Sequence, residues 1–217
     1  MNEETSYIGD KEIYDNSLKF FGAITASVSH ELNNVISIID QTGGLLDDLL
    51  YSADAGKPIP PGKLHSIVDK IAVQTDRGVR IIKRMNYFAH SIDDPIRQTD
   101  IIQLIDNFSQ LMQRLASQKK IEIIASYSAD PISVSTSPFL LELLLYYLIK
   151  SSFVSYDTER KLRIEASQSG GELIILVERL PDALAPNALI PQELSARLKC
   201  RLDSIRKENI DYYRLQL

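Results

Sequence analysis

The chain has 217 residues, of which 44% are hydrophobic and 24% charged, as in an ordinary soluble globular protein of one large domain or two small ones. A formal net charge of −5 argues against nucleic acid or an anionic membrane as the main partner. The single cysteine, Cys200, excludes an intrachain disulfide, and without a secretory leader or an apolar run of about 20 residues we expect a cytoplasmic protein.

The first long helix is predicted from a heptad pattern. Residues 1–16 are polar and acidic and are interpreted as a short N-terminal tail or a helical lead-in, and Asn16 or Ser17 is suited to cap a helix that runs to about Tyr51. Apolar positions then alternate steps of four and three. They are Phe21, Thr25, Val28, Leu32, Val35, Ile39, Thr42, Leu46 and Leu49.

A second helix follows a connection rich in glycine and proline at residues 55–62. Its pattern runs through Leu64, Ile67, Ile71, Gln74, Gly78, Ile81, Met85, Phe88 and Ile92. Two such helices and a short loop predict an antiparallel hairpin. Because the apolar stripes of only two helices do not fill a core, we expect two hairpins to pair into a dimeric four-helix bundle. The alternative is a hairpin packed on its own C-terminal domain.

His30 is the candidate reactive residue. It lies at the position farthest from the heptad seam, with Glu31 beside it and Asn34 four residues later on the same outer side. A neutral imidazole is a nucleophile near pH 7, so an exposed histidine with a carboxylate and a carboxamide nearby suits phosphoryl transfer. His65 and His90 lack such a neighbourhood and are interpreted as surface residues.

A basic stretch on the second helix is expected near the level of His30 in an antiparallel hairpin. It comprises Arg77, Arg80, Lys83 and Arg84. Positive charge there would steer an acidic partner, although ordinary solvated charge explains the stretch equally well.

The C-terminal half predicts an α+β domain. Asp93-Asp94-Pro95 ends the hairpin, which gives domains at residues 17–94 and 95–217. We expect a helix capped by Asp100, a strand at 120–127, a short strand at 132–134, and a buried helix at about 139–153 that begins at Ser137-Pro138. Strands at 161–167 and 172–178 flank Gly170-Gly171, followed by a link at 180–191, a helix to about Arg206 that includes Cys200, and a strand at 209–217.

This order of elements, with the motif His30-Glu31-Leu32-Asn33-Asn34, resembles the core of sensor histidine kinases, a helical dimerisation and phosphotransfer domain followed by an ATP-binding α/β sandwich. The resemblance implies that His30 is the phosphorylated histidine and that Glu31 helps to deprotonate and orient its ring. It also implies that Asn34 positions water in those members that have phosphatase activity. Val35 departs from the family, which often has proline there.

The ATP-binding half departs much further from the family pattern. The positions of its two asparagines, one a magnesium ligand, are matched by Tyr146 and Lys150, and the Asp-x-Gly-x-Gly loop by residues 178–182, which contain no glycine. The segment 180–191 is too short for a nucleotide lid. We therefore expect a degenerate domain that binds no ATP and no metal of its own.

A phosphoacceptor without a nucleotide pocket resembles the histidine phosphotransferases built on degenerate kinase folds. The resemblance implies a homodimer that takes a phosphoryl group from the aspartate of a response-regulator receiver domain and passes it to another receiver. The receiver would supply Mg²⁺, and Asn33, Arg77, Arg80 and Arg84 would contact it. Two alternatives stay open: a non-catalytic scaffold for a regulator or kinase, and a response-regulator phosphatase that uses Glu31 and Asn34.

Overall fold

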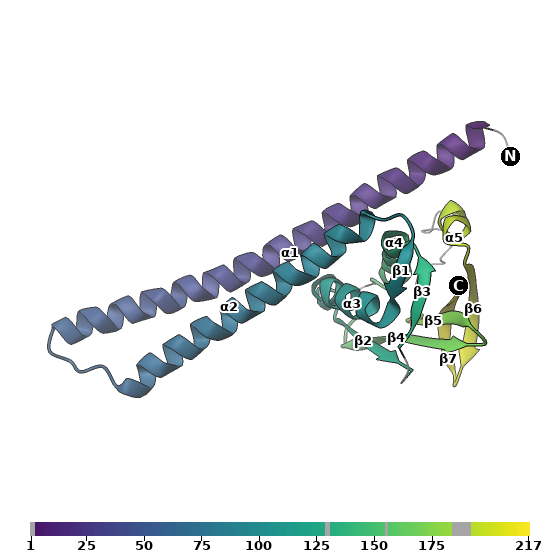
Figure 1. Ribbon diagram of the computed structural model, residues 1–217. Helices are drawn as coiled ribbons and strands as arrows, with labels where there is room; N and C mark the ends of the chain where they lie inside the picture. The colour runs from purple at the N-terminus through teal and green to yellow at the C-terminus, as the bar shows by residue number, and fades with distance from the viewer. Residues whose placement is uncertain (1–2, 129–130, 155, 184–191) are drawn as a thin grey trace. The chain divides into compact units, whose positions relative to one another are not determined.

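The computed structural model describes residues 3–128, 131–154, 156–183 and 192–217. The fold is α+β, with a helical N-terminal region followed by a mixed sheet and its helices, as expected (Figure 1). Within the described residues, no helix has the length and apolarity needed to cross a lipid bilayer. The chain divides into two compact units, residues 25–86 and a second unit that joins residues 1–24 to residues 87–217.

The first unit is the predicted antiparallel hairpin. It contains most of α1 (Glu3–Asp54) and most of α2 (Pro61–Ala89). The buried seam follows the heptad positions, because Val28, Val35 and Thr42 on α1 and Ile67 and Ile81 on α2 are all less than a tenth exposed. At Gly78 the two helices are in contact, since a Cβ atom there would lie 3.5 Å from Val35 Cγ1, an ordinary van der Waals distance.

Helix α1 begins at Glu3, so the expected helix start near Asn16 was wrong, and residues 3–16 are the helical lead-in that was the alternative to a tail. The extra turns are polar, but they carry two apolar anchors, Ile13 and Phe20, which are 5% and 0% exposed. Helical stability in proteins comes mainly from packing of this kind, which propensity and capping signals do not reveal.

The second unit holds a five-stranded sheet in the order β2-β4-β5-β7-β6. Its strands are β2 (Ile121–Tyr127), β4 (Arg160–Ser169), β5 (Glu172–Glu178), β6 (Arg201–Lys207) and β7 (Ile210–Gln216). β2 and β4 are parallel and the other neighbours are antiparallel, so the sheet is mixed as predicted. The β4–β5 turn is the predicted Gly170-Gly171 pair, with φ of +61° and +87°.

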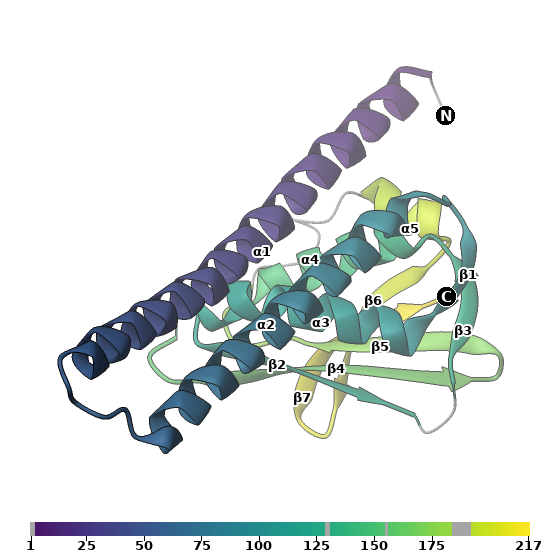
Figure 2. The ribbon, with the colours of Figure 1, turned by 60° about the vertical axis from the view of Figure 1, so that its left-hand side comes forward.

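Helices cover one face of this sheet (Figures 1 and 2). They are α3 (Ile101–Ser117), α4 (Pro138–Ser151) and the short α5 (Gln192–Leu198). The Asp100 carboxylate caps α3 as predicted by accepting the Gln103 N–H at 3.0 Å. Ser137 makes no such side-chain cap on α4, contrary to expectation. α4 itself is buried along residues 141–149, as its sequence predicted.

An aromatic cluster joins the N-terminal part of α1 to the α/β fold inside this unit. The Phe20 ring is fully buried and lies 5.2 Å from the Phe88 ring, 5.7 Å from Phe139 and 4.8 Å from Tyr146. Rings at such separations attract one another beyond their apolar area. Residues 1–24 therefore share a core with the C-terminal half.

Three further elements differ from the sequence prediction. Residues 201–207 form strand β6 at the edge of the sheet, so the predicted helix to Arg206 was wrong, and the half-buried Cys200 follows α5 instead of lying in it. A 3₁₀ turn η1 (His90–Ile92) follows α2. A two-stranded sheet of β1 (Arg97–Asp100) and β3 (Ser133–Thr136) was not fully predicted, because β1 has a single buried residue, Thr99.

Candidate functional site

His30 lies on the solvent side of α1 within the hairpin. His30 and Asn34 are exposed, as their register against the seam predicted. Asn33 is exposed too, whereas Glu31, expected outside, is half-buried. An imidazole in this place is open to a macromolecular partner. The catalytic and partner-binding roles assigned to these residues stay predictions.

The side chains of the motif make no hydrogen bond or ion pair with one another. Among the described residues, no hydrogen bond or ion pair involves the side chain of His30, Glu31 or Asn34. Consecutive residues on a helix point about 100° apart, so Glu31 does not face the His30 ring. Any orientation of the ring by Glu31 would have to arise when a partner binds.

The basic residues of α2 lie at the level of His30. His30 precedes Val35 by five residues and Lys83 follows Gly78 by five. At about 1.5 Å per residue, both lie about 7.5 Å from the Val35–Gly78 contact, in the same direction along the antiparallel pair. The Val35–Gly78 contact thus supports a similar level for the basic stretch and His30 along the hairpin, and the role of the stretch stays a prediction.

One side of the hairpin gathers the polar motif. Asn34 precedes the buried Val35 by one residue, as Arg80 precedes the buried Ile81. Equivalent positions on antiparallel helices lie on the same side of the pair. Arg80 Nη1 is 3.6 Å from Asp76 Oδ2 in an exposed ion pair, so its charge is partly compensated.

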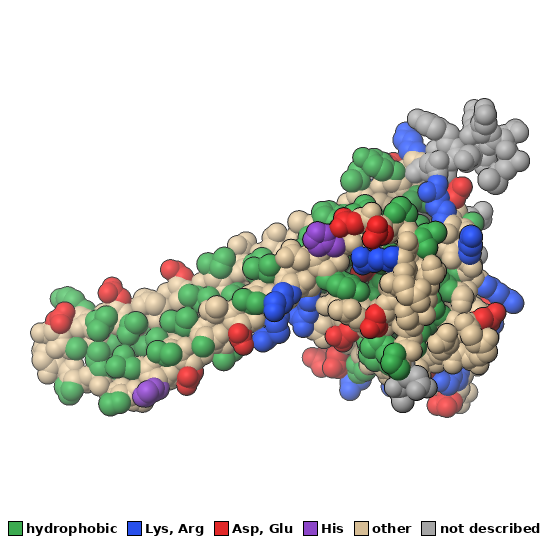
Figure 3. Space-filling model, viewed as in Figure 1, with side chains coloured by type: hydrophobic (Ala, Val, Ile, Leu, Met, Phe, Trp, Pro, Cys, Tyr) green, Lys and Arg blue, Asp and Glu red, His purple; other side chains and the backbone are tan. Residues whose placement is uncertain are grey.

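The opposite side of the hairpin is apolar. Ile36, Val68 and Ile82 each follow a buried seam residue by one position, and they are 61%, 63% and 49% exposed. Hydrophobic side chains lie along both helices in Figure 3. Val79, 45% exposed, follows the seam residue Gly78 by one position and lies on this side as well, whereas the exposed Leu45 and Val73 each precede a seam residue by one and lie on the other side. Exposed apolar surface of this extent marks an interaction site.

His90 has an oriented imidazole that sequence reasoning missed. Its Nδ1 atom lies 2.7 Å from Asp93 Oδ2, and both side chains are more than half exposed. The spacing of three residues after a helix end was the available signal. His65 is exposed, as predicted, and has no hydrogen bond or ion pair among the described residues.

Of the two positions that match the family's asparagines, Tyr146 is buried and Lys150 is exposed. Tyr146 is 5% exposed, and its ring contacts Phe20 and, at 5.3 Å, Tyr147. The Lys150 ammonium lies 5.2 Å from the centre of the Tyr146 ring. Burial raises the pKa of Tyr147 to about 12. These residues form a repacked wall, and no carboxamide is present at either position to bind a cation.

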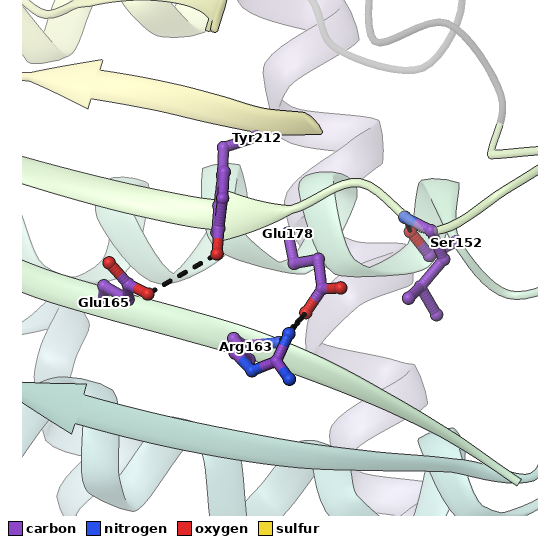
Figure 4. Close-up of polar contacts among 6 residues, drawn as sticks. Ser152, Arg163, Glu165, Glu178 and Tyr212 are labelled. Carbon is purple, nitrogen blue, oxygen red and sulfur yellow. Dashed lines mark hydrogen bonds and ion pairs between the residues drawn. The ribbon is translucent and has the colours of Figure 1, made fainter. Parts of the chain in front are cut away.

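The loop that matches the adenine-binding motif is held by its own side chains. Glu178 Oε2 accepts the Arg163 backbone N–H at 3.1 Å and the Arg163 guanidinium at 3.2 Å, and nearby Tyr212 donates to Glu165 (Figure 4). The Leu180 N–H is 3.4 Å from Ser152 Oγ. A cavity of about 440 Å³ adjoins this loop, and its charged lining is mainly acidic: Glu178, Asp182 and Asp211 with Arg179.

The sequence also predicted that the chain has no metal site of its own and no nucleotide lid. Within the described residues, no group of three or more histidine, cysteine or acidic side chains is arranged to hold a metal ion. The segment 180–191, predicted to be too short for a nucleotide lid, lies from residue 184 onward outside the described residues.

Comparisons with known proteins give similar folds at low identity. No family model matches the chain, and no curated protein is similar to it. Histidine kinase AdeS of Acinetobacter baumannii is 13% identical over 87% of this chain and 96% of its own, with a TM-score of 0.45. Histidine kinase ThkA, in complex with response regulator protein TrrA, is 14% identical over 100% of this chain and 67% of its own, with a TM-score of 0.46.

A bacterial phosphotransferase is 10% identical over 92% of this chain and 96% of its own, with a TM-score of 0.44. At these identities and TM-scores, the likeness assigns neither a family nor a function to the chain. The functional argument therefore depends on the residues themselves.

Proposed function

We propose that the protein is a histidine phosphotransferase of a two-component phosphorelay, with His30 as the phosphoryl acceptor. The observation that carries the proposal is an exposed His30 in a helical hairpin, in a chain that has Tyr146 and Lys150 where the family has its two asparagines, one of them a magnesium ligand. The first feature suits a phosphoryl acceptor. The second leaves another protein as the phosphoryl donor.

The reaction moves one phosphoryl group from the aspartate of a receiver domain to His30. A ring nitrogen of neutral His30 attacks phosphorus, the P–O bond to the receiver's aspartate breaks, and the aspartate leaves as a carboxylate. The phosphoryl group is then bonded to nitrogen, and attack by a second receiver's aspartate reverses the step. Such a transfer needs alignment and charge neutralisation more than acid–base catalysis by the protein.

Neutralisation would come from both partners. The receiver would bring Mg²⁺ with its aspartate, while Arg84 and Arg77 follow seam positions by three residues and thus lie on the side of Asn34. In this proposal they attract an acidic receiver to the polar side of the hairpin, and Asn33 contacts it.

The absence of ATP chemistry is supported by the repacked C-terminal half. A triphosphate is usually held by backbone N–H groups of glycine-rich turns and by a metal ion. Here the matching loop holds Glu178 against Arg163, and the adjoining cavity has mainly acidic charges, which repel phosphate. Titration calorimetry with Mg-ATP is expected to give no binding in the micromolar range.

The proposal includes a homodimer. The apolar side of the hairpin, opposite the polar motif, would pair with the same side of a second copy and complete a four-helix bundle. This arrangement keeps His30 and Asn34 available to a receiver.

The test follows label from receiver to protein. A panel of receiver domains is phosphorylated with ³²P acetyl phosphate and mixed with wild type, His30→Ala, His65→Ala and His90→Ala. We expect label on wild type and on the two control variants, and at least 100-fold less on His30→Ala. If no receiver labels wild type, or if His30→Ala accepts equally well, the proposal is wrong; label lost in His90→Ala would move the acceptor to the His90–Asp93 pair.

Phosphatase activity is a second candidate, favoured by the exposed carboxamide of Asn34 beside His30. The discriminating result is accelerated loss of receiver phosphate that survives His30→Ala and disappears in Asn34→Ala. A complex with a receiver that forms without transfer or hydrolysis, and that tolerates both substitutions, would instead identify a scaffold.

A further inference from the structure

A hollow of about 540 Å³ lies in the second unit, beside the N-terminal part of α1. The buried part of its lining is apolar, with Ile13 5% and Phe139 6% exposed. The lining also keeps large apolar side chains in solvent, because Tyr14 is 63%, Leu18 56% and Ile92 60% exposed. Exposed apolar side chains that gather around a hollow mark a binding surface, whereas scattered ones need no explanation.

The exposed residues of α1 form a ridge along one edge of the hollow. Tyr14, Leu18 and Phe21 are spaced by four and three residues, so their side chains share one face of the helix. The same spacing lets one helix place its side chains into the gaps between those of another helix. The patch formed by the hollow and this ridge therefore contains both a protruding row and a recess next to it.

The charges at the hollow are of opposite sign. Asp94 and Arg197 both line it, and both are exposed. One acidic and one basic side chain give no preference for a partner with a net charge of either sign. A second copy of the same patch, turned about a two-fold axis, is complementary to both, because in such an interface residue i contacts j and j contacts i. Asp94 of each copy then meets Arg197 of the other, whose guanidinium has five N–H donors and can serve more than one acceptor.

The size of the patch suits weak self-association. A leucine or isoleucine side chain offers on the order of 100 Å² of apolar surface, and an aromatic one about 200 Å². With Phe21 38% exposed and the other three at the fractions given above, these side chains leave roughly 300 Å² of apolar surface open, below the roughly 800 Å² per partner of a standard interface. An area of this size is typical of a transient contact and not of a permanent complex.

We infer that this patch is a self-association surface of the second unit. Tyr14 and Leu18 of each copy enter the hollow of the other copy, and two Asp94–Arg197 pairs flank the contact. The surface is distinct from the apolar side of the hairpin and does not depend on the proposed phosphotransfer. Because every contact occurs twice about the axis, a single substitution changes two contacts in the dimer.

The experiment is sedimentation equilibrium of the full chain that carries Ile36→Asp and Ile82→Asp, substitutions that weaken pairing through the hairpin. We expect this parent protein to form dimers with a dissociation constant on the order of 10–100 µM. A parent that stays monomeric up to about 1 mM overturns the inference. Transfer of label to His30 is not measured here, so a failure of this test leaves the proposed function unaffected. Thermal melts verify that every variant is folded.

Two adjacent substitutions in this parent test the ridge. Leu18→Glu places a charge against the hollow of the other copy and should weaken the dimer at least tenfold. Lys19→Glu is the matched control, because Lys19 is exposed at the next position but does not line the hollow. It should change the dissociation constant less than threefold. Equal effects of the two substitutions overturn the inference.

Charge reversal tests the two-fold contact itself. Asp94→Arg alone and Arg197→Asp alone each create two like-charge contacts in the dimer and should weaken it at least tenfold. A mixture of these two variants has opposite charges at both contacts, so a heterodimer should form with a dissociation constant within threefold of the parent's. Lys199→Asp, at an exposed position outside the hollow, controls for net charge and should have little effect. If the mixture associates no better than either variant alone, the occupant of the hollow is not a second copy and the inference is wrong.

Discussion

The hairpin and the α/β unit treat apolar residues in opposite ways. In α4, residues 141–149 are buried without interruption, and the α/β unit closes its core with Phe20 from the start of the chain. In the hairpin, Ile36, Val68 and Ile82 stay about half exposed or more. A core that is closed within one chain is typical of a stable fold, and a stripe left open is typical of a surface awaiting a partner.

The largest expected effect concerns the closed core. Phe20→Ala removes the ring at the centre of the aromatic cluster and should lower the free energy of unfolding by about 4 kcal/mol, measured by urea denaturation. The neighbouring Phe21 is 38% exposed, and Phe21→Ala should cost about 1 kcal/mol or less. Equal losses in the two variants would mean that the N-terminal part of α1 is not a member of this core.

The next effect concerns the pH dependence of stability that the buried Glu142 carboxyl introduces into the same core. Because burial raises the pKa of Glu142 to about 8, the folded state keeps a proton that the unfolded state releases above about pH 4.5. Stability is therefore expected to fall as pH rises from about 5 to 8, by about 3 kcal/mol, and Glu142→Gln should remove this slope.

The measurement is urea unfolding of both proteins at pH 5, 6, 7 and 8. Tyr87, Ser91 and Arg97 also act electrostatically in this cluster, and they are unchanged in the variant, so the difference between the two proteins isolates Glu142. Glu122→Gln, at an exposed glutamate, should leave the slope unaltered. A parallel pH dependence of wild type and Glu142→Gln would show that the carboxyl is ionised.

The smallest effect addresses the open stripe of the hairpin. The double variant with Ile36→Asp and Ile82→Asp places two charges on the apolar side and should weaken dimerisation about 100-fold, or about 2.7 kcal/mol, measured by light scattering at several concentrations. Tyr51→Asp, at an 80% exposed position off this side, should leave the dimer intact. A wild type that is monomeric at all concentrations would contradict the predicted bundle.

Sequence patterns predicted the elements that carry periodic apolar residues. The seam through Val35 and Ile81, the buried α4, and the Gly170-Gly171 hairpin all have local signals. Strand β1 has none, because it is short and polar and depends on pairing with β3. In β6, Leu202 and Ile205 are three residues apart, a spacing that is also typical of a helix. The strand is defined by the turn that follows it at Glu208 and Asn209, whose φ values are +52° and +64°.

The candidate site was predictable in part. The outward register of His30 and the level of the basic stretch follow from helix geometry, so both could be derived from spacing. The absence of a hydrogen bond between Glu31 and His30, the His90–Asp93 pair and the buried Glu142 carboxyl without a partner among the described residues depend on side-chain placement in three dimensions. No spacing rule carries that information.

Strand β6 gives the sheet a protected border. Within the part of the chain that the structure describes, β6 is the last strand of the sheet and has one row of backbone groups without a neighbouring strand, which in many proteins seeds fibril-like stacking. Four of its seven side chains, Arg201, Asp203, Arg206 and Lys207, are charged, and burying them between two stacked sheets would be costly. At high protein concentration, self-association should therefore stay limited to discrete oligomers rather than extended β-aggregates.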